Sequence, residues 1–354
     1  MTKSHLFMLL KTPALLLADP GSANRRFVGQ LALAAWFLFG VSAIELLAQT
    51  SPTIDFSTCT EITAADGEEI EYEFDQTLGT SQEIDPFGPT PHEVVAQMIK
   101  MAKVTKDDVV YDLGSGDGRI PIAAAKQAGA RGVGIELRSE LVEESRETAE
   151  QEGVADRVKF FEADFFEKDL SEATVVLLYL YPRTLLGLRS KLLSELPPGA
   201  RIVAYNYGIE GWPRDDERPV DNAETYFNGI LYYWVVPANV SGSWKGTIET
   251  ELGETHSFTL QLSQCFQKVN GKVLRGEREM ALKDVRLRGD RLHFSLDLPG
   301  DESLQLVATA DGHQMKGHAR RAGPDTQGQL SETRIQWQAK RDPATKTSID
   351  PAQN

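Results

Sequence analysis

The amino-acid sequence predicts an α/β fold, a doubly wound parallel sheet followed by an antiparallel all-β barrel or sandwich. Between residues 89 and 207, short apolar strands alternate with helices, which is typical of a parallel sheet covered by helices on both faces. Beyond residue 237, short runs of alternating polarity are separated by turn dipeptides, as in antiparallel hairpins. The chain has 354 residues, of which 41% are hydrophobic, so it is long enough to form two packed cores.

The N-terminal region consists of a basic lead and one apolar segment. Residues 1–26 carry four basic side chains, and residues 27–48 are predominantly apolar with an uncharged centre at residues 31–44. Because a membrane-spanning helix needs about twenty residues, the apolar segment predicts a single uncleaved membrane anchor. It also fits the apolar part of a cleaved signal peptide, and the sequence leaves both alternatives open.

An acidic linker at residues 49–85 follows the apolar segment. Ten acidic residues and no Lys or Arg lie between Ser51 and Thr90, and they account for −10 of the formal net charge of −15. Such a composition is typical of a solvated tether.

The negative charge of the chain disfavours a nucleic-acid partner, because a protein that binds a phosphate backbone needs a basic face of its own. Two cysteines and six histidines without ligand-like spacing predict that no metal is bound.

Residues 86–237 are predicted to form the α/β domain. Thr90, Pro91 and Glu93 have the pattern of an N-cap, a first helical residue and a capping-box partner, so a helix is expected to begin at Pro91. Five apolar runs predict strands at residues 108–113, 132–137, 158–161, 174–181 and 200–207. Three further runs predict helices at residues 120–127, 139–151 and 183–196.

Residues 238–342 are predicted to form a small antiparallel β domain of eight strands. Its turn signals are the pairs Asn270-Gly271, Gly289-Asp290, Pro299-Gly300 and Asp311-Gly312. Trp244 and Trp337 lie near the two ends of this region and are expected to pack in its core. Residues 343–354 are polar and are predicted to form a disordered tail.

The strongest functional signal lies where the first two strands of the α/β domain end. The first strand ends in Asp112 and continues into a turn where Gly114, Gly116 and Gly118 let the backbone turn tightly and approach a ligand. The second strand ends in Glu136, whose carboxylate can accept hydrogen bonds from two ribose hydroxyls. In a parallel sheet these strand ends lie at one edge, so together they predict a nucleoside site.

These motifs resemble those of the class I, seven-strand S-adenosylmethionine-dependent methyltransferases over residues 86–237. Residues 85–91 and 109–125 are similar to bacterial relatives of the protein-lysine methyltransferases that modify the c-subunit of ATP synthase. The resemblance implies methyltransferase activity, S-adenosylmethionine as cofactor, and a final antiparallel strand at residues 230–236. It implies that Asp112 and the glycines hold the methionine end, Glu136 the ribose, and Asp164 with Phe165 the adenine edge. The complete set of cofactor-binding residues that it implies is Thr90, Asp112, Gly114, Ser115, Gly116, Gly118, Glu136, Asp164 and Phe165.

The methyl acceptor is expected near the end of the fourth predicted strand. Tyr179 and Tyr181 lie there, and the sequence leaves open whether they line an acceptor pocket or only pack against neighbours. The Asn/Asp-Pro-Pro-Tyr pattern of nucleobase amino methylases is missing at this strand end, which disfavours that class. The expected reaction is an in-line displacement at the sulfonium methyl, in which positioning matters more than a dedicated base.

Two functional hypotheses from different classes remain open. The first is a membrane-tethered methyltransferase that N-methylates a protein lysine, with a small molecule, a quinone or a lipid as alternative acceptors. The second is an exported protein whose β domain binds a lipid or peptide and whose methyltransferase domain is degenerate. Because S-adenosylmethionine is a cytosolic metabolite, the cofactor residues predict a membrane-associated protein with a cytoplasmic catalytic domain. The basic lead predicts the opposite orientation, and a cleaved signal peptide would give export.

Overall fold

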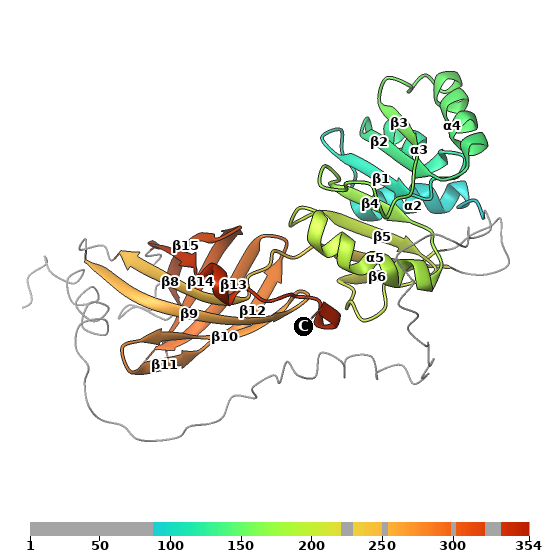
Figure 1. Ribbon diagram of the computed structural model, residues 1–354. Coiled ribbons are helices and arrows are strands. Elements are labelled where there is room, and N and C mark those ends of the chain that lie inside the picture. The colour runs from blue at the N-terminus through green and yellow to red at the C-terminus, as the bar shows by residue number, and fades with distance from the viewer. Residues whose placement is uncertain (1–87, 221–228, 250–253, 299–301, 323–333, 354) are drawn as a thin grey trace, which may run out of the picture. The chain divides into compact units, whose positions relative to one another are not determined.

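The computed structural model describes residues 88–220, 229–249, 254–298, 302–322 and 334–353 (Figure 1). The predicted basic lead, apolar segment and acidic linker lie outside these residues, as does the predicted turn at residues 299–300. No helix within the described ranges is long and apolar enough to cross a membrane. The strands of these ranges form two sheets, one mixed and one antiparallel.

The first sheet has seven strands in the order β3-β2-β1-β4-β5-β7-β6. Their bounds are β1 Val109–Leu113, β2 Arg131–Glu136, β3 Val158–Glu162, β4 Val175–Leu178, β5 Arg201–Tyr205, β6 Asp216–Val220 and β7 Gly229–Val235. Strands β1 to β5 pair in parallel, and β7 is antiparallel to both of its neighbours. This confirms the doubly wound, seven-strand sheet. The strand order reverses between β1 and β4, which places a ligand crevice at their carboxyl ends.

Two strands of this sheet differ from the sequence-based expectation. Strand β4 ends at Leu178, three residues before its predicted end, so Tyr179 and Tyr181 belong to the loop that follows. Strand β6 was not predicted, because its first four residues are exposed and only Val220 is buried. Pairing with β7, and not an apolar pattern, makes this segment a strand.

The α-helices of the described residues cover the two faces of the sheet (Figure 1). Their bounds are α2 His92–Ala102, α3 Arg119–Ala128, α4 Ser139–Gln151 and α5 Pro182–Glu195. Side chains of β1 alternate between the faces, as the strand period of two requires. Tyr111 and Leu113 join the core with the buried leucines of α5, whereas Val110 joins the core with α2 and α3. Asp112 therefore lies on the α2 and α3 face, at the end of a central strand.

Helix α2 begins one residue later than predicted. Pro91 is its N-cap, with a non-helical ψ of 142°, and its carbonyl accepts hydrogen bonds from the N–H groups of Val94 and Val95. The predicted capping arrangement, with Thr90 as N-cap, is therefore wrong. Thr90 is buried, and its backbone carbonyl accepts a hydrogen bond of 2.9 Å from Nη1 of Arg119. Thr90 thus joins the segment before α2 to the first residue of α3.

The second sheet has nine antiparallel strands and curls into a nearly closed barrel, in the order β11-β10-β9-β8-β16-β15-β14-β13-β12. Their bounds are β8 Gly242–Glu249, β9 Thr255–Cys265, β10 Lys268–Arg275, β11 Arg278–Ala281, β12 Lys283–Arg288, β13 Arg291–Leu298, β14 Glu302–Asp311, β15 Gln314–Ala322 and β16 Arg334–Arg341. Eight strands were predicted. The additional strand is β11, which has no buried residue and hence no apolar pattern. Trp244 and Trp337 are buried in this barrel, as expected.

One predicted turn of the barrel is wrong. Asn270-Gly271 lies inside β10 and pairs with β9. A Cβ atom on Gly271 would lie 2.2 Å from the carbonyl oxygen of Gln261, so the glycine permits close contact between strands and does not make a turn. The chain reverses at Phe266 instead, which has a positive φ of 50°. The pair at residues 289–290 does connect β12 to β13, as predicted.

The predicted disordered tail is ordered in the described residues up to 353. It contains two short 3₁₀ helices, Pro343–Thr345 and Pro351–Gln353. Asp350, which is buried, accepts hydrogen bonds from Nε and Nη2 of Arg189 at 3.1 and 3.0 Å. The Ser190 hydroxyl donates a third hydrogen bond, of 2.9 Å. The polar composition predicted disorder, but these polar side chains are paired with partners on α5.

The turn between β9 and β10 shares the apolar core that α5 forms with the first sheet. Phe266 is 1% exposed and stacks on Trp212 with ring centroids 5.9 Å apart and an interplanar angle of 13°. Nε1 of Trp212 donates a hydrogen bond of 3.2 Å to Oε1 of Gln267. Trp212 lies in the loop from β5 to β6, so this loop is held by the β9–β10 hairpin of the barrel.

We expect Asp350→Ala to lower the free energy of unfolding by about 3 kcal/mol, because it leaves a largely buried guanidinium without its carboxylate partner. The side chains of Arg189 and Asp350 are 11% and 4% exposed. The matched control is Asp342→Ala, which removes an exposed carboxylate that accepts a hydrogen bond from the N–H of Ala344. Urea unfolding of both variants tests this expectation, and equal losses would contradict it.

Candidate active site

A glycine turn connects β1 to α3 at the point where the strand order reverses. Gly114 and Gly118 have φ angles of 78° and 76°, which L-residues with a side chain rarely adopt. A Cβ atom on Gly118 would also lie 2.7 Å from Oγ of Ser145 and from the ring of Phe160. Glycine is therefore required at residue 118 both by the turn and by close packing against α4 and β3. The sequence predicted the tight turn and the close approach of a ligand, but not the close packing against α4 and β3.

Glu136, at the end of β2, holds this turn with its carboxylate. Oε2 accepts a hydrogen bond of 3.0 Å from the backbone N–H of Gly116. Oε1 accepts hydrogen bonds from the N–H groups of Leu137 and Arg138, both 3.1 Å, and from Nε of Arg138 at 3.2 Å. A carboxylate oxygen has two lone pairs, so Oε2 can accept one further hydrogen bond, such as one from a ribose hydroxyl.

Asp112 is a buried carboxyl group at the end of β1. The residue is 3% exposed, and among the described residues none donates a hydrogen bond to its side chain. Burial, together with the carboxylates of Glu136 and Asp117, raises the pKa of Asp112 well above its ordinary value. A buried carboxylate of this kind is stabilised by a nearby cation, so a ligand with a positive charge would suit this position.

Ser115 adds a second buried polar atom to the glycine turn. Its N–H donates a hydrogen bond of 3.0 Å to the carbonyl of Ile135, which fixes the turn on β2. Its Oγ is buried and has no hydrogen-bond partner within the described part of the chain. Buried hydroxyls are normally paired, so this atom is available to a ligand. The donor and acceptor groups of Asp112, Ser115 and Glu136 therefore fit a nucleoside with an attached amino acid.

Asp164 and Phe165 follow β3 and complete this edge of the sheet. Phe165 is buried, and its Cε1 lies 3.9 Å from the position that a Cβ atom on Gly114 would occupy. Its ring is tilted against that of Phe166, with centroids 4.9 Å apart. Oδ1 of Asp164 accepts a hydrogen bond of 2.8 Å from the N–H of Phe166, which fixes the loop. Phe165 thus lies near the glycine turn, at the same edge of the sheet.

Tyr179 and Tyr181 lie beyond β4, on either side of Leu180. The Leu180 side chain lies 3.2 Å from the position of a Cβ on Gly114, so this loop touches the glycine turn. Tyr181 is 42% exposed, whereas Tyr179 is half-buried and lies near Gly88, ahead of α2. The two predicted acceptor residues therefore lie next to the candidate cofactor site.

Two further tyrosines were missed by the sequence analysis. Tyr205 lies with its ring centroid 4.9 Å from that of Tyr179, and Tyr207 stacks on Tyr181 at 6.3 Å and 21°. The side chain of Asn206, between them, forms a hydrogen bond with Tyr179. A pattern that could have identified them was present in the sequence, because a Tyr-x-Tyr run ends both the fourth and the fifth predicted strand. We call these four residues, Tyr179, Tyr181, Tyr205 and Tyr207, the tyrosine cluster.

The arrangement defines a class of enzyme. The seven-strand order with an antiparallel β7, the glycine turn after β1 and the acidic residue at the end of β2 are those of a class I S-adenosylmethionine-dependent methyltransferase. Within the described ranges, no group of three or more His, Cys, Asp or Glu side chains could hold a metal ion.

Comparison with known proteins gives the family. A family model described as the ANTKMT methyltransferase domain matches residues 112–216. A protein-lysine N-methyltransferase of Saccharolobus islandicus is 41% identical over 152 residues, which are 43% of this chain and 93% of that protein. The chain belongs to the ANTKMT family of S-adenosylmethionine-dependent methyltransferases, and S-adenosylmethionine is its cofactor.

Other relatives match the same part of the chain. The human lysine N-methyltransferase of the ATP synthase c-subunit is 38% identical over 130 residues, which are 37% of this chain and 55% of that protein. A solved structure described as an RNA methyltransferase from Salinibacter ruber in complex with S-adenosyl-L-homocysteine is 46% identical. It covers 43% of this chain and 96% of that chain, with a TM-score of 0.40.

We expect Asp112→Asn to stabilise the cofactor-free protein while weakening cofactor binding. A carboxyl group whose pKa is raised on folding binds its proton more tightly in the folded state. Above the ordinary pKa of an unfolded Asp, about 3.9, such a group therefore lowers the stability of the folded protein as pH rises. The variant removes this cost. Its advantage over the wild type should be absent at low pH and grow as pH increases, and its affinity for S-adenosylmethionine should fall about tenfold.

Thermal unfolding across a pH series and calorimetric titration measure both effects. The matched control is Asp107→Asn, which makes the same change in charge at an exposed residue close in sequence. A pH-independent difference in stability, or unchanged affinity for the cofactor, would contradict the role given to Asp112.

Proposed function

We propose that this methyltransferase N-methylates a lysine side chain of a protein substrate. The observation that carries this proposal is the tyrosine cluster next to the glycine turn, in a chain whose relatives are named as protein-lysine methyltransferases. Tyr181 and Tyr207 are two of the three large apolar side chains that are clearly exposed in the described residues. An exposed, stacked aromatic pair is suited to contact with a substrate chain.

The proposed cofactor roles follow the resemblance with two changes. Glu136 would accept one ribose hydrogen bond in place of the two expected, because its Oε1 already accepts three hydrogen bonds from the chain, and Thr90 would not bind the cofactor directly. Asp112 and Ser115 would hold the polar groups of the methionine end, and Glu136 would accept a hydrogen bond from the ribose. Phe165, with Asp164, would contact the adenine. Thr90 would act indirectly, since its carbonyl binds Arg119 at the start of α3. When bound, S-adenosylmethionine supplies an activated methyl group on a positively charged sulfur.

The tyrosine cluster would prepare the lysine amine for attack. Aromatic faces attract an ammonium group, and a desolvated site lowers the pKa of a lysine, which favours the neutral nucleophile. Burial raises the pKa of Tyr179 above its ordinary value, although its hydrogen bond to Asn206 opposes this. Tyr179 therefore stays protonated at neutral pH and positions the amine without acting as its base. The amine proton would pass to solvent through the exposed side of the cluster.

The acceptor assignment is tested with the purified full chain, methyl-labelled S-adenosylmethionine, and soluble and membrane fractions of cells. After acid hydrolysis of the protein, the label should appear in methylated lysine. Label confined to lipids or small molecules would contradict the lysine acceptor and leave the methyltransferase class intact.

Within this assay, Tyr181→Ala and Tyr207→Ala should each raise the KM for the protein acceptor about tenfold, because each removes one face of the aromatic pair. The KM for S-adenosylmethionine should stay unchanged. Tyr181→Phe and Tyr207→Phe are the matched controls and should behave like the wild type, since they keep the ring. Wild-type acceptor KM values in the alanine variants would show that the pair does not contact the substrate.

We also propose that the protein is membrane-associated, with its catalytic domain on the cytoplasmic side. The apolar residues 27–48 support the membrane association, and the cytosolic supply of S-adenosylmethionine supports the orientation. A fluorescent reporter that folds only in the cytoplasm, fused after Asn354, should be active in a membrane fraction. An inactive reporter would indicate export of the domain.

A further inference from the structure

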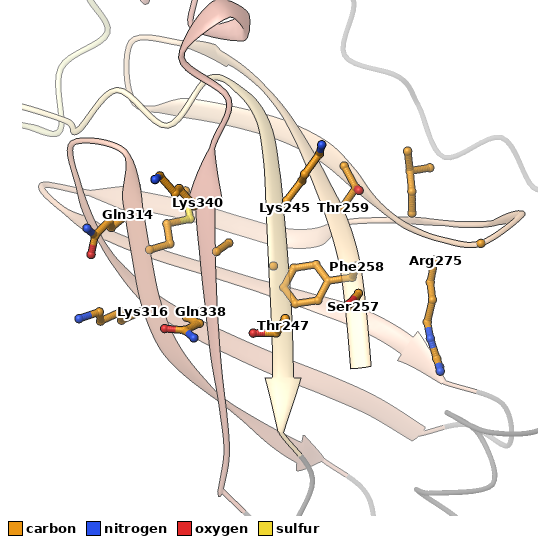
Figure 2. A pocket seen from close by; sticks show the side chains of 15 residues that line it. Lys245, Thr247, Ser257, Phe258, Thr259, Arg275, Gln314, Lys316, Gln338 and Lys340 are labelled. Atoms are coloured by element: carbon orange, nitrogen blue, oxygen red, sulfur yellow. The ribbon is translucent and has the colours of Figure 1, made fainter. Parts of the chain in front are cut away.

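The outer surface of the barrel has a hollow with basic lining residues, and none of its lining residues belongs to the candidate active site. A cavity of about 650 Å³ lies over strands β8, β9, β10, β15 and β16 (Figure 2). Its lining includes Lys245, Lys316 and Lys340, and none of its fifteen lining residues is Asp or Glu. The whole chain has a formal charge of −15, so a lining whose charged residues are all basic contrasts with the composition of the chain.

Strand register places the polar lining residues on one face of the sheet. Residues directly opposite each other on paired strands share a face. One row across β15, β16, β8 and β9 consists of Gln314, Lys340, Lys245 and Thr259. The next row consists of Lys316, Gln338, Thr247 and Ser257. Figure 2 shows these eight side chains on the neighbouring strands.

This face points away from the barrel core. Gly246, Met315 and Ala339 lie between the two rows and alternate with them, and all three are buried. Lys245, Lys316 and Lys340 are exposed. The two rows therefore form a polar grid on the outer face of the barrel, with adjacent strands about 4.8 Å apart. We call the three lysines with their hydroxyl and amide neighbours the basic grid.

The charges of the basic grid are not compensated within the described part of the chain. None of its three lysines forms an ion pair there. Lys245 and Lys340 are directly opposite each other on β8 and β16. Like charges directly opposite each other destabilise a sheet. Lys316 adds a third positive charge, because it is a diagonal neighbour of Lys340. An anion bound between the lysines would relieve this repulsion.

We infer that the basic grid binds an anion carrying two or more phosphate charges. Three ammonium groups match the charge of such a ligand, and lysine is a common phosphate-binding residue. The hydroxyls of Thr247, Ser257 and Thr259 and the amides of Gln314 and Gln338 supply additional donors around them. The cavity volume lies within the range of about 300–1,000 Å³ found for small-ligand sites. The ligand is either a free polyphosphate or a phospholipid headgroup, which share this chemistry.

The experiment uses the full chain and two probes. Inorganic pyrophosphate is titrated by calorimetry as the soluble probe. Phosphatidylcholine vesicles with and without cardiolipin are used in a cosedimentation assay as the lipid probe. The double variant Lys245→Gln/Lys340→Gln should weaken binding of the active probe about tenfold, because it removes two of the three lysine ammonium groups of the basic grid. Its thermal stability should equal or exceed that of the wild type, since a repulsive pair is lost.

The matched control is Lys272→Gln/Lys283→Gln, which changes the charge of the same barrel equally. These lysines are paired with Glu279 and Asp297, and neither lines the cavity. The control should bind both probes like the wild type. Binding of pyrophosphate would identify a soluble ligand, and binding of cardiolipin vesicles alone would identify a headgroup.

The inference is overturned if the wild type binds neither probe, or if the double variant and the control lose affinity equally. It is also overturned if an oligoglutamate peptide binds the grid and neither pyrophosphate nor cardiolipin vesicles do, since this would show an acidic-peptide site. These outcomes are independent of methyl transfer, because no residue of the grid belongs to the candidate active site.

Discussion

The hydrogen bond from the Gly116 N–H to the carboxylate of Glu136 holds the candidate active site together. It joins the turn after β1 to the end of β2, two segments that are adjacent in the sheet because the strands pair in parallel. The backbone carbonyl of Gly116 also accepts a hydrogen bond of 3.1 Å from the Ser145 hydroxyl of α4. A turn fixed in this way brings Asp112 and Ser115 to one place while both stay buried. The remaining residues of the candidate cofactor site are arranged around this turn.

The site extends from the glycine turn to the loops after β4 and β5. Leu180 contacts the glycine turn, and the tyrosines on either side of it meet Tyr205 and Tyr207. The loop that leaves Tyr207 leads to Trp212, which stacks on Phe266 of the β9–β10 turn. Nη1 of Arg189 donates a hydrogen bond of 2.7 Å to the Glu210 carbonyl of the same loop. The segment carrying Tyr207 is therefore supported by α5 and by the barrel.

Local sequence patterns predicted the parts of the fold that depend on local interactions. The turn from Asp112 to Gly118 and the acid at Glu136 could be found, because a strand end, glycines and a carboxylate are visible in the sequence. Tyr205 and Tyr207 were missed, because only the pairing of β4 with β5 brings them to Tyr179 and Tyr181.

The errors in the barrel and the tail have the same origin. Asn270-Gly271 has the composition of a turn, but the close approach of β9 requires the glycine within a strand. Residues 343–353 are polar like a disordered tail, but Arg189 provides Asp350 with a partner that is 161 residues away in the sequence. Both features depend on contacts between distant segments, and composition carries no information about them.

The central claim is that Glu136 and the glycine turn form the S-adenosylmethionine site, and calorimetric titration of Glu136→Ala tests it most directly. The matched control is Glu162→Ala, because Glu162 is the register partner of Glu136 on β3 and is exposed. The wild type and the control should bind S-adenosylmethionine with equal affinity, whereas Glu136→Ala should lose about 2–3 kcal/mol of binding free energy, as expected for hydrogen bonds to a charged group. Equal affinity of all three proteins would contradict the account.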